Sequence, residues 1–441
     1  MNHFYPATTL ALALSQAGTA LAENPYLEEV IVTSSRIEMP LRQVGTSVSV
    51  VTREKIQQRG FNSLHDILRS QPSIGVTNAG GAGKATSLRI RGEESYRTLV
   101  LLDDIDISDT STPQVTPRME YLLSSGIQRV EILRGPQGLM YGADAGGVVN
   151  ITTVRQTDGL AGQVSAEGGR YGSQQFAGNL GWGNETIDVN VSAADFQTDG
   201  FNARTTDQDL RDDDGYDNTT LHGRFGWNVS EDLRLSLVAR NVDGDTDYDG
   251  CFNPDTFASS NRCKDEFEQD IWRVAGDYQW GRFSHQGFYS NSETNRDSYS
   301  DGQLSGRFDG EIERYGYRAS FQGSDALRLV YGVDLETESA DGTFLTGDRD
   351  QDGYYLEYQG GFKDRIFVTA GARYDDNDDF GTHTSYRSSG AYLVPVSGGE
   401  IKLKAAYGTG FRAPSLSEIA TNLSPFTLPP TAGLELSEEE S

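Results

Sequence analysis

Alternation of apolar and polar residues with period two is the feature that most constrains this chain. From about residue 159 onward, apolar residues take every second position in stretches of about ten residues. Successive side chains of a β-strand point to opposite faces, so each stretch predicts a strand with one apolar and one polar face. A tilted strand of about this length can cross a bilayer. Clear examples run from Ile187 to Ala193, from Leu327 to Glu336 and from Ile401 to Gly408.

The connections between these stretches alternate in length. Short turns on one side and long loops on the other are typical of outer-membrane barrels. Trp182, Trp227 and Trp280 adjoin short connections, as expected of an aromatic girdle at a membrane interface. We therefore predict a mainly β chain containing a transmembrane antiparallel β-barrel, because a soluble β-sandwich would not explain the asymmetry. The short connections are predicted near 183–185, 229–232, 281, 323–326, 362–364 and 396–399, and the long ones near 199–216, 243–266, 298–308, 340–352, 376–384 and 412–433.

The N-terminal third is organised differently. Thr8 to Ala22 is small and apolar and ends in Ala-Leu-Ala, which predicts a secretory signal peptide at 1–22 despite the absence of Lys and Arg before it. Residues 23–44 form a polar lead. Residues 45–155 combine the strand-like segments SVSVVT, TLVLLDD and IQRVEILRG with a helix in SLHDILRSQP, where Ser63 is the expected N-cap. This predicts an α+β domain followed by the barrel at 156–441.

Composition narrows the function classes. The formal net charge of −28 argues against a nucleic-acid partner. The mean hydropathy is −0.52, and after the signal peptide no stretch is apolar enough for a membrane helix. A chain of this kind can cross a membrane only as a closed barrel, with lipid on its outer face. No arrangement of Ser, His and Asp or of paired carboxylates suggests catalysis, so we predict that the protein is not an enzyme.

The two cysteines, Cys251 and Cys263, lie in one polar segment, CFNPDTFASSNRC. In an exported protein such a pair is expected to form a local disulfide. A metal site is the weaker alternative, because no histidine lies near them in the sequence. A catalytic thiol is also disfavoured, because no base is nearby.

Six segments of the chain stand out as motifs: EEVIVTSSR at 28–36, DILRSQPSIGV at 66–76, LRIRG at 88–92, VLLDD at 100–104, VEILRGPQGLMYGADAGGVVNITT at 130–153 and YGTGFRAPSLSEI at 407–419. These segments resemble conserved segments of the TonB-dependent outer-membrane transporters. The resemblance implies an α+β plug domain inside the barrel lumen and a location in the bacterial outer membrane. The final GLELSEEES resembles the segment that opens the next strand in such proteins, so we expect an incomplete barrel of about 14 out of 22 strands.

The family resemblance also implies an energy-coupling partner, the TonB protein. Its expected contact is a TonB box on the polar lead, whose extended, β-branched residues can add as a strand to a sheet edge of the partner. The alternative is an ordinary first strand of the plug. Arg91, Glu131 and Arg134 are expected to join an ionic network between plug and barrel. The predicted TonB box comprises Glu28, Glu29, Val30, Ile31, Val32 and Thr33.

A glycine-rich segment, NAGGAGKAT at 78–86, resembles the plug apex that contacts the ligand in this family. It is not a P-loop, because Asn78 stands where the first glycine is required. A plain surface turn is the alternative interpretation. The ligand-binding residues implied by the resemblance are Asn78, Gly80, Gly81, Lys84 and Thr86.

Two outer segments are dense in aspartate. DQDLRDDDGYD at 207–217 has six aspartates in eleven residues, and DGDTDYD at 243–249 has four in seven. Such a density suits a hard cation such as calcium, although solvated loops near cation-bridged lipid heads would look alike. Parts of these segments resemble calcium loops of cobalamin-transporting family members, so cobalamin (vitamin B12) is the expected cargo. The implied calcium ligands are Asp212, Asp214, the Tyr248 backbone, Asp249 and Asp265.

Other cargoes and roles stay open at this point. A ferric siderophore is the main alternative. A haem receptor is less favoured, because residues 415–435 lack the histidine expected after the FRAP segment at 411–414. A receptor that signals without transporting is a further alternative.

Overall fold

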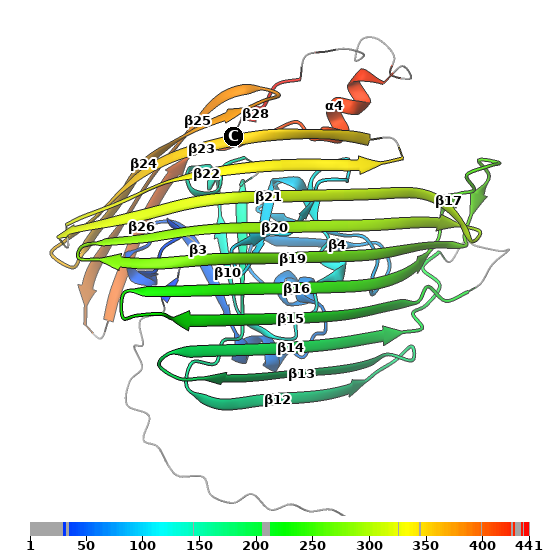
Figure 1. The fold of residues 1–441 in the computed structure, drawn as a ribbon, viewed down its shortest axis with the longest axis horizontal. Helices are drawn as coiled ribbons and strands as arrows, with labels where there is room; N and C mark the ends of the chain where they lie inside the picture. Colours follow the sequence, from blue (N-terminus) through cyan, green and yellow to red (C-terminus); the bar gives the residue numbers. More distant parts are fainter. Residues whose placement is uncertain are drawn as a thin grey trace, which may run out of the picture.

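A computed structural model describes residues 30–31 (backbone), 35–143, 145–204, 212–324, 326–343, 345–397, 399–424, 427, 434 and 436–440. Long antiparallel strands form one curved sheet, and the compact α+β unit predicted to be the plug packs against one face of that sheet (Figure 1). The predicted signal peptide at 1–22 lies outside the described residues. No helix in the described part of the chain is long and apolar enough to cross a membrane.

The plug is built around a five-stranded sheet in the order β3-β10-β11-β6-β7. β11 pairs with β6 in parallel, whereas the other neighbours are antiparallel. The three segments predicted as strands are β3 (Ser47–Thr52), β6 (Thr98–Leu102) and β10 (Ile127–Arg134), and β7 (Ile105–Asp106) and β11 (Gly147–Thr153) complete the sheet.

Short helices and hairpins surround this sheet. The predicted helix is α2 (Leu64–Arg69) with Ser63 in the N-cap position, although the Ser63 side chain forms no cap hydrogen bond. The core combines the apolar faces of α2, β6, β10 and β11. The remaining plug elements are β1 (Val30–Ile31), β2 (Met39–Pro40), η2 (Leu41–Gln43), α1 (Arg53–Arg59), β4 (Ile74–Asn78), β5 (Thr86–Ile90), η3 (Ser95–Arg97), β8 (Ser108–Asp109), β9 (Thr116–Pro117), η4 (Met119–Tyr121) and α3 (Gly138–Tyr141).

The barrel part is a single thirteen-stranded sheet in which each strand pairs with the next strand of that sheet along the chain. Its two edges, β12 and β26, have no partner strand in the described part of the chain. The strands are β12 (Gly159–Gly168), β13 (Gln174–Gly183), β14 (Ile187–Thr198), β15 (Tyr216–Asn228), β16 (Leu233–Tyr248), β19 (Cys263–Trp280), β20 (Phe283–Ser300), β21 (Gln303–Ser324), β22 (Leu327–Gly342), β23 (Leu345–Phe362), β24 (Ile366–Asn377), β25 (Gly381–Val396) and β26 (Gly399–Gly408).

Three of the predicted long loops are wrong. Residues 298–308, 340–352 and 376–384 belong mostly to strands that continue beyond the apolar band, and only tight turns separate β20 from β21, β22 from β23 and β24 from β25. β21 reaches 22 residues. Backbone hydrogen bonds extend a ladder whatever the side chains are, so polar composition alone does not mark where a strand ends. The predicted short turns are confirmed by the strand boundaries.

The two faces of the sheet carry opposite chemistry. On β19, Ile271 and Gln269 are buried against the plug, whereas Trp272 and Val274 lie exposed on the other face. Many outward residues are large and apolar, as expected of a surface that meets lipid. Beyond the sheet, β17 (Cys251–Phe252) and β18 (Ser259–Ser260) form an outer hairpin, and α4 (Leu416–Leu423) follows β27 (Phe411–Arg412), which pairs with β28 (Glu439–Glu440).

Candidate functional site

The predicted apex loop connects β4 to β5, and the Asn78 side chain organises it. Its Oδ1 accepts hydrogen bonds from the backbone N–H groups of Gly80 and Gly81 at 3.0 and 2.6 Å, and its Nδ2 donates to Thr86 Oγ1 at 2.9 Å. Gly80 has φ 145°, and a Cβ there would lie 2.7 Å from the Ala203 Cβ. The loop therefore needs glycine both for its backbone and for its fit against the barrel.

Lys84 lies beneath this loop and joins the plug to the acidic outer segments. Its side chain is buried, and its Nζ donates to the backbone oxygens of Asp214 and Gly215, both at 3.2 Å, and to Thr246 Oγ1 at 3.0 Å. Burial lowers the pKa of Lys84 to about 8. The neighbouring carboxylates act in the opposite direction, and that of Asp214 raises the pKa the most among them. Lys84 thus binds the acidic segments through backbone oxygens and a hydroxyl, near the carboxylates of Asp214, Asp247 and Asp249.

Thr86 is also buried at the base of the loop. Its backbone N–H donates to Glu120 Oε2 at 3.2 Å, and its hydroxyl donates to the Lys84 carbonyl at 2.7 Å. Burial raises the pKa of the Glu120 carboxyl. Of the five predicted ligand-binding residues, Lys84 and Thr86 therefore hold the apex together from below, whereas Asn78 and Gly81 face a cavity.

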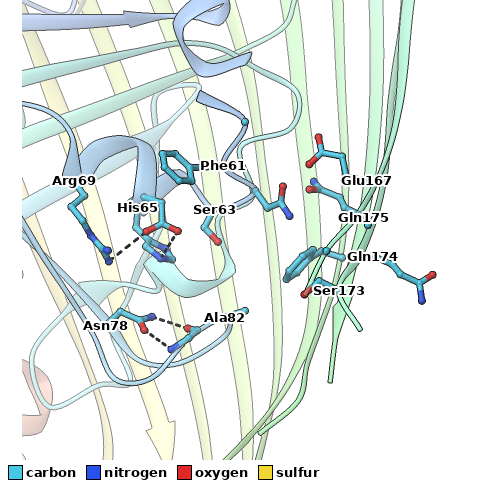
Figure 2. Close-up of a pocket in the computed structure, with 17 residues that line it drawn as sticks. Phe61, Ser63, His65, Arg69, Asn78, Ala82, Glu167, Ser173, Gln174 and Gln175 are labelled. Atoms are coloured by element: carbon cyan, nitrogen blue, oxygen red, sulfur yellow. Dashed lines mark hydrogen bonds and ion pairs between the residues drawn. The ribbon is translucent and has the colours of Figure 1, made fainter. Parts of the chain in front are cut away.

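That cavity has a volume of about 480 Å³ and lies between the plug apex, the turn before α2 and the outer end of the β12–β13 hairpin (Figure 2). This volume falls within the range of small-molecule sites. Its lining is mainly polar and combines amides, hydroxyls and glycine backbone with few large apolar groups. The lining residues are Gly60, Phe61, Asn62, Ser63, His65, Asp66, Arg69, Asn78, Gly81, Ala82, Glu167, Gly168, Gly169, Ser173, Gln174, Gln175 and Phe196.

The charged groups of the cavity come from α2 and were not predicted as site residues. His65 Nε2 lies 3.7 Å from Asp66 Oδ2, and Asp66 Oδ1 lies 3.4 Å from an Arg69 guanidinium nitrogen (Figure 2). Burial lowers the pKa of His65. The segment HDILR was interpreted only as a helix, because nothing in the sequence places α2 beside the outer end of β12. The arrangement offers donors and acceptors on several sides to a polar ligand.

The predicted calcium ligands do not converge in this arrangement. No three of the carboxylates of Asp212, Asp214, Asp249 and Asp265 have oxygens within 4.8 Å of one another, and all four belong to the described residues. Asp214 Oδ2 accepts a hydrogen bond from the Ala203 N–H at 2.7 Å, and Asp212 is exposed.

The outer loops hold two further predicted groups. Asp265 Oδ1 accepts a hydrogen bond from the Tyr248 hydroxyl at 3.2 Å. Two of the residues predicted to bind calcium are therefore in contact through their side chains. Cys251 and Cys263 form the predicted disulfide at the base of the β17–β18 hairpin. The acidic loops are thus held by Lys84 and by this covalent closure.

At the other end of the plug, only the backbone of Val30 and Ile31 is described in the predicted TonB box. These two residues form β1, which pairs with β2 through Val30–Pro40 and Ile31–Met39. Glu28, Glu29, Val32 and Thr33 lie outside the described residues. The box therefore takes part in a two-residue ladder.

The residues that follow the box are tied to the barrel wall by a cluster that we call the lead anchor. Ser35 Oγ donates to Glu357 Oε1 at 2.6 Å, and Arg387 binds Glu357 Oε2 at 2.6 Å. Arg36 lies 3.2 Å from Asp334, which also contacts Arg314 and Arg373 at 3.3 and 2.8 Å. Ser35 lies 322 residues from Glu357 in the sequence and Arg36 lies 298 residues from Asp334, so no local pattern could predict these contacts. The lead anchor comprises Ser35, Arg36, Asp334, Glu357 and Arg387.

An ionic contact between plug and wall is made by a residue that was not predicted for this role. Arg134, which was predicted, donates to the Pro72 carbonyl and to Ser49 Oγ, both within the plug. Asp103 Oδ1 lies 2.7 Å from Arg224 on β15. Asp103 and Arg224 belong to the VLLDD turn and to a barrel strand, and their meeting depends on how the two domains pack.

Two family models together match most of the chain. The TonB-dependent receptor plug domain matches residues 40–149, and the TonB-dependent receptor β-barrel matches residues 153–435. The chain belongs to the TonB-dependent receptor family. The predicted fold, the outer-membrane location and the absence of an enzymatic role are thereby confirmed. The boundaries predicted at residues 22, 44 and 155 stay predictions.

Individual relatives agree with this assignment. The receptor is 29% identical over 427 residues to the vitamin B12 transporter BtuB of Photobacterium profundum, covering 93% of this chain and 67% of that protein. It is similar in fold to the siderophore receptor PirA of Pseudomonas aeruginosa (21% identity, TM-score 0.66, covering 83% of this chain and 62% of that one). A variant of the ferric enterobactin receptor PfeA from the same organism superposes with TM-score 0.72 at 18% identity, covering 90% and 65%. The chain thus spans about two thirds of the length of these relatives.

Proposed function

We propose that the receptor imports a scarce nutrient across the outer membrane with energy delivered by TonB. The observation that carries this proposal is the arrangement of the lead: a two-residue ladder at the box, followed at once by side chains buried in the barrel wall. Such a short ladder is easily exchanged for strand addition to a partner, whose main-chain hydrogen bonds then grip the lead. Force on the box would reach the wall through Ser35 and Arg36.

A proline in the box tests this coupling. Ile31→Pro removes a backbone donor needed for strand addition, so uptake should be abolished while the affinity for the cargo stays unchanged. Ile31→Ala keeps the donor and is the matched control, which should transport normally. Both variants are compared by labelled-cargo uptake in cells and by equilibrium binding to the purified receptor. Normal uptake by the proline variant would remove the TonB-box assignment.

We propose cobalamin as the cargo. The support is the aligned relative named as a vitamin B12 transporter, which matches almost the whole chain, together with the mainly polar lining of the apex cavity. The peripheral amides of a corrinoid both donate and accept hydrogen bonds. The Gln175 side chain, which lines the cavity, offers both a donor and an acceptor to such an amide. A cavity of about 480 Å³ would take one edge of such a large ligand.

A ferric siderophore is the alternative cargo, since the structural neighbours PirA and PfeA are siderophore receptors. Their identities are low, so they support the shared fold more than a shared ligand. Calorimetry with cyanocobalamin and with ferric enterobactin separates the two. Cobalamin binding that weakens in Gln175→Ala supports the first cargo. Binding of the siderophore alone would replace it.

We also propose that calcium orders the acidic outer loops. An ion bound there would have to draw Asp212, Asp214, Asp249 and Asp265 together, and ordering the loops in advance would lower the entropic cost of binding cargo. Calcium should then tighten cobalamin binding, and the double variant Asp212→Ala, Asp214→Ala should lose that dependence. Equal affinity with calcium and with chelator in the unmodified receptor would contradict this proposal while leaving the cargo assignment intact.

A further inference from the structure

The short ladder between β27 and β28 determines which way the side chains of Glu438, Glu439 and Glu440 point. The register places Glu440 opposite Phe411 and Glu439 opposite Arg412. Glu439 turns to the guanidinium groups of Arg412 and Arg97, at 3.4 and 2.5 Å. Since alternate residues of a strand share a face, Glu438 and Glu440 turn together to the opposite side.

His383 faces these two glutamates from the start of β25. Its ring packs on the Phe411 ring, with 4.2 Å between centroids, and its side chain is only 10% exposed. Its Nδ1 lies 3.5 Å from Glu438 Oε1, and within the described residues its ring nitrogens form no hydrogen bond. One ligand atom each from His383, Glu438 and Glu440 lie within 4.8 Å of one another, the only such group of three or more among the described residues.

The cations nearby are committed elsewhere. Arg412 binds Glu418 at 2.6 Å as well as Glu439, and it stacks on the Tyr96 ring at 4.3 Å. Arg412 is therefore not free to balance the charges of Glu438 and Glu440. One imidazole nitrogen with two carboxylate oxygens is a ligand set for a borderline divalent metal such as zinc, whereas calcium prefers oxygen ligands throughout.

We propose that His383, Glu438 and Glu440 bind a zinc ion or a similar first-row divalent cation. Glu440 is exposed, which leaves room for water to complete a tetrahedral shell. The bound metal fastens residues 436–440 to β25, which lies beside β28 (Figure 1). It joins two segments 55 residues apart (383 and 438) at the end of the sheet where α4 lies, independently of cargo and TonB.

Zinc binding to the purified, chelator-stripped receptor tests the proposal. Calorimetry should show one zinc site, and thermal unfolding should shift to higher temperature when zinc is present. His383→Ala and the double variant Glu438→Gln, Glu440→Gln should each weaken zinc binding roughly tenfold or more, since loss of even an outer partner of a metal site has an effect of that size. His285→Ala on the outward face of β20 and Glu400→Gln on β26 are the matched controls and should bind like the unmodified receptor.

Cobalt provides a second readout. Co²⁺ in the same site should give a visible absorption spectrum that changes in His383→Gln, a variant that keeps the side-chain volume. The absence of zinc binding by the unmodified receptor would overturn the proposal, whether or not any variant folds. Equal zinc affinity in His383→Ala would also overturn it, because His383 would then not be a ligand of the ion.

Discussion

The plug and the barrel sheet are stabilised by opposite choices of buried residue. In the plug, Val100, Ile132 and Val149 are fully buried and pack against one another. In the sheet, the buried face carries Glu357 and Arg373, whereas apolar residues such as Leu403 are exposed. The barrel strand β14 alternates between more and less exposed positions with period two, whereas the plug strand β6 is buried at every position. The difference shows that the inside of a strand is defined by what it packs against, not by which face is apolar.

The energetic consequence differs between the two regions. A buried apolar side chain stabilises the plug through removal from water and through close packing. A buried charge on the sheet is tolerated only because partners surround it, so removal of one partner leaves the others unpaired. The lead anchor is the clearest case of this second kind. Substitutions in the two regions should therefore destabilise the protein for different physical reasons.

The largest effect is expected for Asp334→Ala. Its carboxylate contacts Arg36, Arg314 and Arg373, and its loss leaves three guanidinium groups with less counter-charge in a buried site. We expect a loss of about 3–5 kcal/mol in the free energy of unfolding, measured by denaturant titration in detergent micelles. Asp297→Ala breaks an exposed pair with Arg307 and should cost about 1 kcal/mol or less. Equal losses would remove the distinction between buried and surface pairs.

Ile132→Ala tests the plug side of the comparison. Ile132 is fully buried on β10, so truncation leaves a cavity and should lower the free energy of unfolding by about 2–5 kcal/mol. Ile401→Ala, on the exposed face of β26, should change it by about 0.5 kcal/mol or less in detergent. The same titration measures both. A large loss for Ile401→Ala would mean that the outward face packs more tightly than its exposure indicates.

A smaller effect, with a pH dependence, is expected for Asp106→Asn. Burial raises the pKa of Asp106 in the plug to about 6, and Glu336 on the wall adds to the shift. Between about pH 4 and pH 6, Asp106 is deprotonated in the unfolded chain but still protonated in the folded protein. The free energy of unfolding therefore falls as the pH rises through this range, and it stays lower at pH 7. The asparagine variant should therefore be more stable at pH 7, by about 1–3 kcal/mol, and should lack this pH dependence.

The control for this effect is Asp158→Asn, an exposed aspartate before β12, which should leave both the stability and its pH profile unchanged. Stability is compared at pH 5 and 7 in the same detergent. A profile for Asp106→Asn that matches the unmodified receptor would show that the carboxyl is solvated in the folded state.

The relation between sequence and structure differs from element to element. The strands β14, β22 and β26 could be predicted from alternation alone, because lipid on one side and the lumen on the other impose period two. The disulfide could be predicted because its cysteines are local and the chain is exported. The extension of β21 to 22 residues could not, because beyond the membrane both faces are polar and the ladder continues without an apolar signal.

The candidate site divides in the same way. Asn78 and Gly81 were predicted from a glycine-rich loop, and both face the cavity, whereas His65 and Glu167 were missed because only the tertiary structure brings α2 and β12 to the same cavity. The alternation, the family motifs and the local disulfide are properties of neighbouring residues, so the sequence by itself determined them. Tertiary structure alone decided that Lys84 contacts the backbone of Asp214 and that Arg387 reaches Ser35. A buried charge is stabilised by whichever partner the folded chain brings within reach, and for Arg387 that partner lies 352 residues away in the sequence.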